Sequence, residues 1–348
     1  MDLIFIGIVI FLCVLAVFDL VVGVSNDAVN FINSAVGARV APYKVVVGIA
    51  AVGVLAGASL SNGMMDVARH GIFSPAYFSF FDVICIFLSV MVADVIILDV
   101  FNSLGLPTST TVSMVFELLG GAFALTLVKI NAGMMDADGR LLGFGDLLNT
   151  DKALSVILAI FLSVAVAFLF GALVMWLSRL LFTFVKPRNR SFKTILFGGV
   201  SVTAIIWFLL INGLKSSSLM TPDVKEWVDL NTWNILGVCA VGMTLLMALL
   251  SFLRVNILKT VVLTGTFALA MAFAGNDLVN FIGVPLTGLD AYLDFSAHGA
   301  GDADAFMMSS LQNSAQTPII FLLVAGIIMV LSLTFSKKAQ NVVKTSVD

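Results

Sequence analysis

The sequence has little charge. Of its 348 residues only 11% are Asp, Glu, Lys or Arg, whereas 60% are hydrophobic and the mean hydropathy is +1.11. Soluble domains carry about 25% charged residues, so this chain cannot cover a folded surface with polar groups. The composition excludes a cytosolic enzyme, a disordered chain and a nucleic-acid-binding domain, and it predicts a polytopic membrane protein.

Cysteine and histidine are also scarce, with three and two residues. Cys13, Cys85 and Cys239 all lie in apolar stretches. We therefore expect small core residues rather than a disulfide framework or a metal site. The absence of an HExxH, a GxSxG or a paired Cys/His ligand set argues against a membrane-embedded enzyme with a cofactor. No basic residue precedes the first apolar run, so we expect a retained membrane segment there, not a signal peptide.

Long apolar runs dominate what is present. A membrane-spanning helix needs about 20 apolar residues, whereas barrel strands would alternate in short segments. The runs therefore predict an all-α polytopic membrane protein. The predicted spans are 3–38, 43–60, 77–98, 104–128, 153–185, 195–212, 233–252, 260–289 and 317–335.

The basic residues predict the orientation. They concentrate in three connections: Lys186, Arg188, Arg190 and Lys193; Arg254 and Lys259; Lys337, Lys338 and Lys344. The intervening connections 136–151 and 283–316 are acidic or mixed. The positive-inside rule places the basic loops in the cytoplasm and the N-terminus outside, in a cell (inner or plasma) membrane.

One polar cluster occurs twice. Residues 26–32 read NDAVNFI and residues 276–282 read NDLVNFI, identical at six of seven positions. By the predicted topology the two copies enter the membrane from opposite sides. Such an inverted repeat is the usual plan of secondary transporters.

The chemistry of the cluster favours function. An Asp at the centre of a membrane helix costs roughly 2.5–3.5 kcal/mol on insertion scales. Asn and Asp side chains also compete for the local backbone, so we predict broken or re-entrant helices at both copies. A break offers helix N-termini to anions and carbonyl groups to cations. The alternative is that these side chains only hydrogen-bond neighbouring helices.

A second polar cluster is the run 107–111 (PTSTT), which opens an apolar stretch. Hydroxyl residues behind a proline signal a helix N-terminus. The hydroxyls and N–H groups there can bind an oxyanion, or they can simply cap the helix. Glu117 follows in the same stretch and is either a proton site or a paired buried acid.

At these motifs the sequence resembles the inorganic phosphate transporter family of the PiT type. That family carries Gly-x-Asn-Asp-x-x-Asn twice, in inverted halves, with a Pro-x-Ser-Thr-Thr run after each. Here the two signatures begin at Gly23 and Gly275, and the first run is 107–111. In the first copy the glycine is displaced by two residues and Ser25 precedes Asn26.

The resemblance implies a secondary active transporter that imports inorganic phosphate by symport with Na⁺ or H⁺. It divides the chain into a first inverted repeat (1–185), a cytoplasmic basic loop (186–194), and connecting spans with the start of a second repeat (195–348). The second Pro-x-Ser-Thr-Thr run would fall beyond Asp348, so we expect a truncated chain with no closing helix. The rival function is an ion channel, or a channel or permease for another anion such as sulfate.

The resemblance also implies site residues. Phosphate would be bound by Asn26, Asn30, Ser109, Thr110, Thr111, Asn276 and Asn280. The coupling cation, Na⁺ or a proton, would be bound by Asp27 and Asp277 with Asn26 and Asn276. Secondary candidates are Thr108, Ser25 and Glu117. No Lys or Arg lies in either cluster, so a cation on each Asp would remove its repulsion of the anion and couple the two ligands. The other expected partners are membrane lipid and a second copy of the chain.

Overall fold

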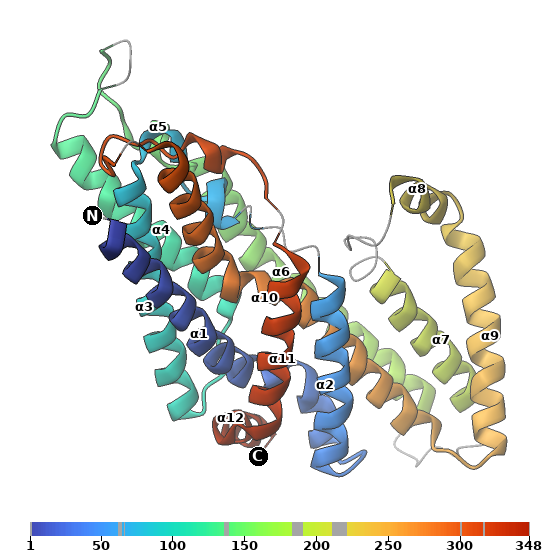
Figure 1. The fold of residues 1–348 in the computed structure, drawn as a ribbon. Coiled ribbons are helices and arrows are strands. Elements are labelled where there is room, and N and C mark those ends of the chain that lie inside the picture. The colour runs from blue at the N-terminus through green and yellow to red at the C-terminus, as the bar shows by residue number, and fades with distance from the viewer. Residues whose placement is uncertain are drawn as a thin grey trace. The chain divides into compact units, whose positions relative to one another are not determined.

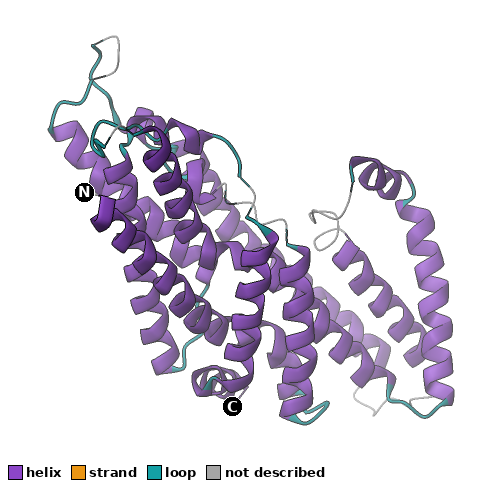
Figure 2. Ribbon diagram, viewed as in Figure 1, coloured by secondary structure: helices purple, strands orange, loops and turns teal. Residues whose placement is uncertain are grey.

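We analysed a computed structural model, which describes residues 2–61, 65, 67–135, 139–182, 191–210, 221–299, 301–315 and 317–347. All regular structure in these ranges is helical apart from isolated bridges (Figures 1 and 2). The chain divides into two compact units. Unit 1 comprises Met1–Asp27, Gly63–Ile160 and Asp277–Ser346, and unit 2 comprises Ala28–Asn62, Phe161–Asn276 and Val347–Asp348.

Unit 1 contains most of the helices. Its long helices are the first part of α1 (Asp2–Gly37), α3 (Phe80–Leu104), α4 (Thr110–Asn131), the last part of α10 (Ile257–His298) and α11 (Ile319–Phe335). The shorter elements are η1 (Val67–Gly71), η2 (Pro75–Tyr77), α5 (Phe144–Leu147), the start of α6 (Thr150–Phe182), η4 (Ser309–Gln312) and α12 (Lys337–Val347).

Unit 2 contains α2 (Tyr43–Leu60), α7 (Phe192–Phe208), α8 (Pro222–Leu230), α9 (Thr232–Phe252) and the remaining parts of α1, α6 and α10. Small residues allow its helices to pack closely. A Cβ added to Gly57 of α2 would lie 2.0 Å from the Met271 carbonyl oxygen of α10, so α2 and α10 touch backbone to backbone there.

The predicted membrane fold is confirmed. Among the described residues, seven helices are long and apolar enough to cross a membrane, or eight if the bent pair α11 and α12 counts as one span. Every predicted span corresponds to a helix, including the shorter apolar α7. The most apolar part of α6 has no buried residue, as expected for a helix that faces lipid. The repeat boundaries and the homodimer stay predictions.

The predicted helix breaks at the two polar clusters are wrong. Both α1 and α10 continue without interruption through residues 26–30 and 276–280. The prediction assumed that the Asn and Asp side chains would compete for their own backbone. Instead Asn26 and Asp27 bond to residues 102–110, so the helical backbone keeps its own hydrogen bonds.

A short helix, α12, follows α11 at a bend of 65°. Two further expectations need correction. α10 extends to His298 with Pro285 inside it, so the acidic connection begins later than 283. The cysteines are free, but Cys13 and Cys85 are exposed on their helices and do not belong to the core. Membrane lipid can cover such residues, so an apolar surrounding in sequence does not imply a protein core.

The two ends of α3 contact different parts of the chain. At its start, backbone hydrogen bonds join α3 to the acidic connection that follows α10: Phe80 N–H donates to Phe306 O (2.8 Å) and Phe81 N–H donates to Ala303 O (3.2 Å). Near its end, Lys338 of α12 pairs with Asp99. The acidic connection and the basic tail thus lie at opposite ends of this helix. Lys186, Arg188, Arg190, Asp136 and Asp138 lie outside the described residues, and the orientation stays a prediction.

Gly23 lets α10 approach α1 beside the first polar cluster. A Cβ added at Gly23 would lie 2.1 Å from Phe281 Cε1, and Phe281 is buried with 1% of its surface exposed. The phenyl ring therefore occupies the space that any other residue at position 23 would fill. The glycine of the first signature serves this close approach between helices.

We predict that Gly23→Ala destabilises the protein by about 1–3 kcal/mol, because it overpacks a buried contact. The measurement is thermal unfolding of the purified protein in detergent. Gly7→Ala on the same helix is the control, since no atom lies within 4 Å of an added Cβ there. A second change, Phe281→Leu, should restore much of the loss. Equal unfolding temperatures for the two glycine variants would contradict the close contact.

Candidate functional site

The run 107–111 forms the start of α4, as predicted. Ser109 is the N-cap residue, and its hydroxyl accepts a hydrogen bond from Val112 N–H at 3.3 Å. The first intrahelical bond is donated by Ser113 N–H to Ser109 O. The N–H groups of Thr110 and Thr111 precede this bond, so they have no acceptor within the helix. This helix start therefore offers both hydroxyl and N–H donors.

Asn26 fixes the position of this helix start. Its amide nitrogen donates to Asn102 Oδ1 (2.8 Å) and to Leu106 O (3.1 Å), and its oxygen accepts from Thr108 N–H (2.7 Å). Asn102 in turn donates to Val22 O (2.7 Å). Both hydrogens of the Asn26 amide are thus used within the protein. In this conformation Asn26 can offer a ligand only the second lone pair of its oxygen.

The two repeated carboxylates meet the helix start at consecutive residues. Thr110 Oγ1 donates to Asp27 Oδ2 at 3.0 Å, and Thr111 Oγ1 donates to Asp277 Oδ1 at 3.3 Å. Asn280 lies one turn beyond Asp277 and donates to Thr111 Oγ1 at 2.8 Å. Because consecutive Cα atoms are about 3.8 Å apart, the carboxylates flank the first turn of α4 from two sides. Each motif therefore supplies one Asp to the same place.

This place differs in exposure from one side to the other. Asp27 is buried, with 5% of its surface exposed, and Thr110 is buried beside it. Ser109 and Thr111 are exposed at the helix start. The site thus combines a buried carboxylate with exposed hydroxyl residues at the helix start.

Among the described residues, the remaining predicted residues make no hydrogen bond to Thr110 or Thr111. Asn30 and Asn276 belong to unit 2 and are exposed. Ser25 is buried, and its hydroxyl contacts Val21 O (2.6 Å) and Ser336 Oγ (2.8 Å), so it secures the bend between α11 and α12. Glu117 accepts a hydrogen bond from Ser113 Oγ at 2.8 Å. It faces other acidic side chains rather than the start of α4.

The sequence analysis missed three polar residues. Asn102 supports Asn26, and Asp19 and Asp94 are almost completely buried, with 0% and 2% of their surfaces exposed. Asp19 and Asp94 each lie inside a predicted span, whereas Asn102 lies between two predicted spans. An isolated polar residue in an apolar run is itself a signal of function or of a buried partner. That signal was available, although it does not identify the partner.

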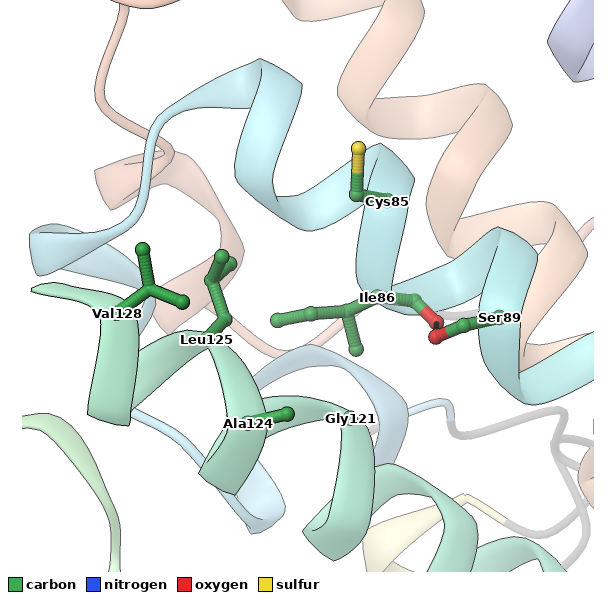
Figure 3. Close-up of a pocket in the computed structure, with 7 residues that line it drawn as sticks. All are labelled: Cys85, Ile86, Ser89, Gly121, Ala124, Leu125 and Val128. Carbon is green, nitrogen blue, oxygen red and sulfur yellow. Dashed lines mark hydrogen bonds between the residues drawn. The ribbon is translucent and has the colours of Figure 1, made fainter.

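A shallow pocket of about 230 Å³ between α3 and α4 is a different feature (Figure 3). Its lining is apolar except for the Cys85 thiol and the Ser89 hydroxyl, which donates to Ile86 O at 2.8 Å. None of the predicted site residues lines it. An anion would find too few donors there, so we do not assign this pocket to the substrate.

We predict that Asn26→Ala destabilises the protein even without phosphate. The change leaves Thr108 N–H and Asn102 Oδ1 without their partner, at a cost of about 1–3 kcal/mol for each unsatisfied group. The measurement is thermal unfolding in phosphate-free buffer, with Asn30→Ala as the control in the same motif. If both variants unfold like the wild type, Asn26 does not position the start of α4.

Comparisons with known proteins agree with the resemblance. A model of the phosphate transporter family matches residues 23–345. A solved structure described as the sodium-dependent phosphate transporter has the same fold, with a TM-score of 0.72 and 18% sequence identity. The alignment covers 98% of this chain and 78% of that one. No curated protein sequence matches significantly. Because the family match extends over most of the chain, this integral membrane protein belongs to the phosphate transporter family.

Proposed function

We propose that the protein is a secondary transporter that imports inorganic phosphate together with a cation, and that the start of α4 is its binding site. One observation carries this proposal. Two carboxylates from the two copies of a repeated motif bond to consecutive threonines at one helix N-terminus. Membership of the phosphate transporter family supports phosphate as the substrate.

Phosphate would bind at the exposed side of the helix start. Removing an anion from water is costly, so the site must replace the lost hydrogen bonds. Ser109, Thr110 and Thr111 supply hydroxyl groups, and the free N–H groups of the first turn lie beside them. The N-terminal end of the helix dipole adds partial positive charge. Asn280 would contribute its amide by leaving Thr111 when the ligand arrives.

A bound cation would allow phosphate to bind beside the two carboxylates. Asp27 and Asp277 lie close enough to affect each other electrostatically, and among the described residues no ion pair involves either. Two uncompensated carboxylates would repel phosphate. A Na⁺ ion or a proton on each would remove the repulsion, so each ligand would strengthen binding of the other. The related structure is described as sodium-dependent, which favours Na⁺ in this proposal.

We predict that the combined change Ser109→Ala, Thr110→Val and Thr111→Val weakens phosphate binding by about 100-fold or more, because hydrogen bonds to a charged ligand contribute about 1.5–3 kcal/mol each. The measurement is isothermal titration of the purified protein with phosphate in Na⁺ buffer. Thr126→Val in α4 is the control. That hydroxyl is buried without a hydrogen-bond partner among the described residues, so its removal should leave phosphate affinity unchanged. If the triple variant binds phosphate with wild-type affinity, the hydroxyl groups of residues 109–111 only cap the helix.

We predict that Asp27→Asn and Asp277→Asn uncouple phosphate from the cation. Each change removes one charge with little change of shape, so cation binding should weaken sharply. Phosphate affinity should then stop responding to the cation instead of falling equally at all cation levels. The measurement is phosphate binding across a Na⁺ series and, separately, a pH series. The response that disappears identifies the coupling ion.

Asp294→Asn on α10 is the matched control for this test, since Asp294 pairs with His298 at the end of the helix. It should keep the wild-type response to both ions. If both motif variants also keep that response, the two carboxylates are structural. The channel alternative is tested in liposomes: phosphate flux that does not saturate and ignores the ion gradient would support a channel over a transporter.

A further inference from the structure

Three acidic side chains other than Asp27 and Asp277 meet inside unit 1. They are Asp19 of α1, Asp94 of α3 and Glu117 of α4. Asp19 precedes Asp27 by eight residues, which corresponds to about 12 Å along the helix. We call Asp19, Asp94 and Glu117 the carboxyl cluster. It comes from three different helices, each long and apolar enough to cross a membrane.

The cluster has more acceptors than donors. The carboxyl groups of Asp19 and Asp94 lie within hydrogen-bonding reach of each other. Yet no donor among the described residues bonds to either oxygen of Asp19, to Oδ1 of Asp94 or to Oε2 of Glu117. The hydroxyl of Ser113 reaches both Asp94 and Glu117, and in the structure it donates to Glu117. One hydroxyl proton cannot serve both carboxyl groups.

The cluster also lacks a compensating charge. The charged groups that face Asp19 are Asp94, Glu117 and Asp27, and all are acidic. The ion pairs formed by described residues involve Asp290, Asp82, Asp146, Asp294 and Asp99. Asp19 is fully buried, and both of its oxygens point into this cluster without a partner. A buried polar side chain in this condition indicates a missing ligand.

We propose that the carboxyl cluster is a proton-binding site, in which Asp19 and Asp94 share one proton. Two carboxyl groups can hydrogen-bond to each other only when one of them carries a proton. The proton supplies the missing donor and removes one of the negative charges, which an apolar interior cannot hold unpaired. Ser113 connects this pair to Glu117, so Glu117 forms the outer member of the same site.

A metal cation fits these residues less well. Such an ion needs several oxygen ligands that converge on one point. Among the described residues, no group of three acidic, histidine or cysteine side chains is placed to hold one. A proton needs only two facing oxygens. The site is therefore distinct in chemistry from the one formed by Asp27 and Asp277, where hydroxyl donors already satisfy the carboxylates.

Proton binding is testable without transport. The protonated pair should give a carboxylic-acid C=O band in the infrared spectrum of the purified full chain, and the band should shift in D₂O. Asp19→Asn should remove the band, because the amide replaces the shared proton as a donor. Asp94→Asn changes the other carboxyl group of the pair and should also remove the band. This second variant replaces Asp19→Asn if that variant folds poorly. Asp99→Asn on α3, outside the cluster, should leave the band intact.

Two results would overturn the proposal. One is a carboxylic-acid band of equal strength in the wild type and in both cluster variants. The other is a wild-type band that disappears when Na⁺ is added, because the cluster would then bind Na⁺ in place of the proton. Neither result depends on phosphate transport, so failure of this proposal remains distinguishable from failure of the proposed function.

The role of this proton in transport rests on the proposed function. If the cluster exchanges its proton during transport, Glu117→Gln should reduce the pH dependence of phosphate uptake by up to ten-fold per pH unit relative to the wild type, since one proton is lost from the linkage. Its Na⁺ dependence should stay unchanged. Phosphate itself titrates in the same way in both assays, so its contribution cancels when the variant is compared with the wild type. An unchanged pH dependence would exclude this role for the cluster.

Discussion

The amide of Asn26 determines where the start of α4 lies, and the candidate site depends on that position. In an apolar interior a polar side chain must find its hydrogen bonds within the protein. Asn26 finds three, one with Asn102 of α3 and two with Leu106 and Thr108 in the connection between α3 and α4. Because Asp27 is the next residue, the same bonds bring Thr110 to its carboxylate. The start of α4 is therefore positioned by Asn26, which belongs to the same motif as the Asp27 that bonds to Thr110 there.

The second motif is brought in by packing rather than by hydrogen bonds alone. Gly23 leaves space for the buried ring of Phe281, which allows α10 to approach α1 one turn before the cluster. Asp277 and Asn280 then reach Thr111 from the other side. The residues that the two copies share are thus used asymmetrically: Asn26 supports the helix start, whereas Asn280, the last polar residue of the second copy, contacts the Thr111 hydroxyl directly.

Much of this could be predicted from the sequence, because the relevant signals are local. Apolar runs of about 20 residues mark membrane helices, and the run 107–111 marks a helix start. The predicted breaks at residues 26–30 and 276–280 failed because the decisive interaction is not local. A sequence shows that Asn26 is polar, but it does not show that Asn102 and Thr108 will take its hydrogen bonds. The partnership of Asp19 with Asp94 was hidden for the same reason, since these residues lie on different helices.

The two groups of buried acids illustrate how neighbouring donors decide what a carboxylate can bind. Asp27 and Asp277 each receive a hydroxyl hydrogen bond from a threonine at the start of α4. In the proposed function these carboxylates bind a cation and, with it, an anion. Asp19 receives no such bond and faces only acidic groups. Its charge has no source of stabilisation, so a proton is the ligand that this surrounding favours. Under the two proposals, the same residue type would bind different ions within one unit, according to whether hydroxyl donors such as the threonines at the start of α4 lie beside it.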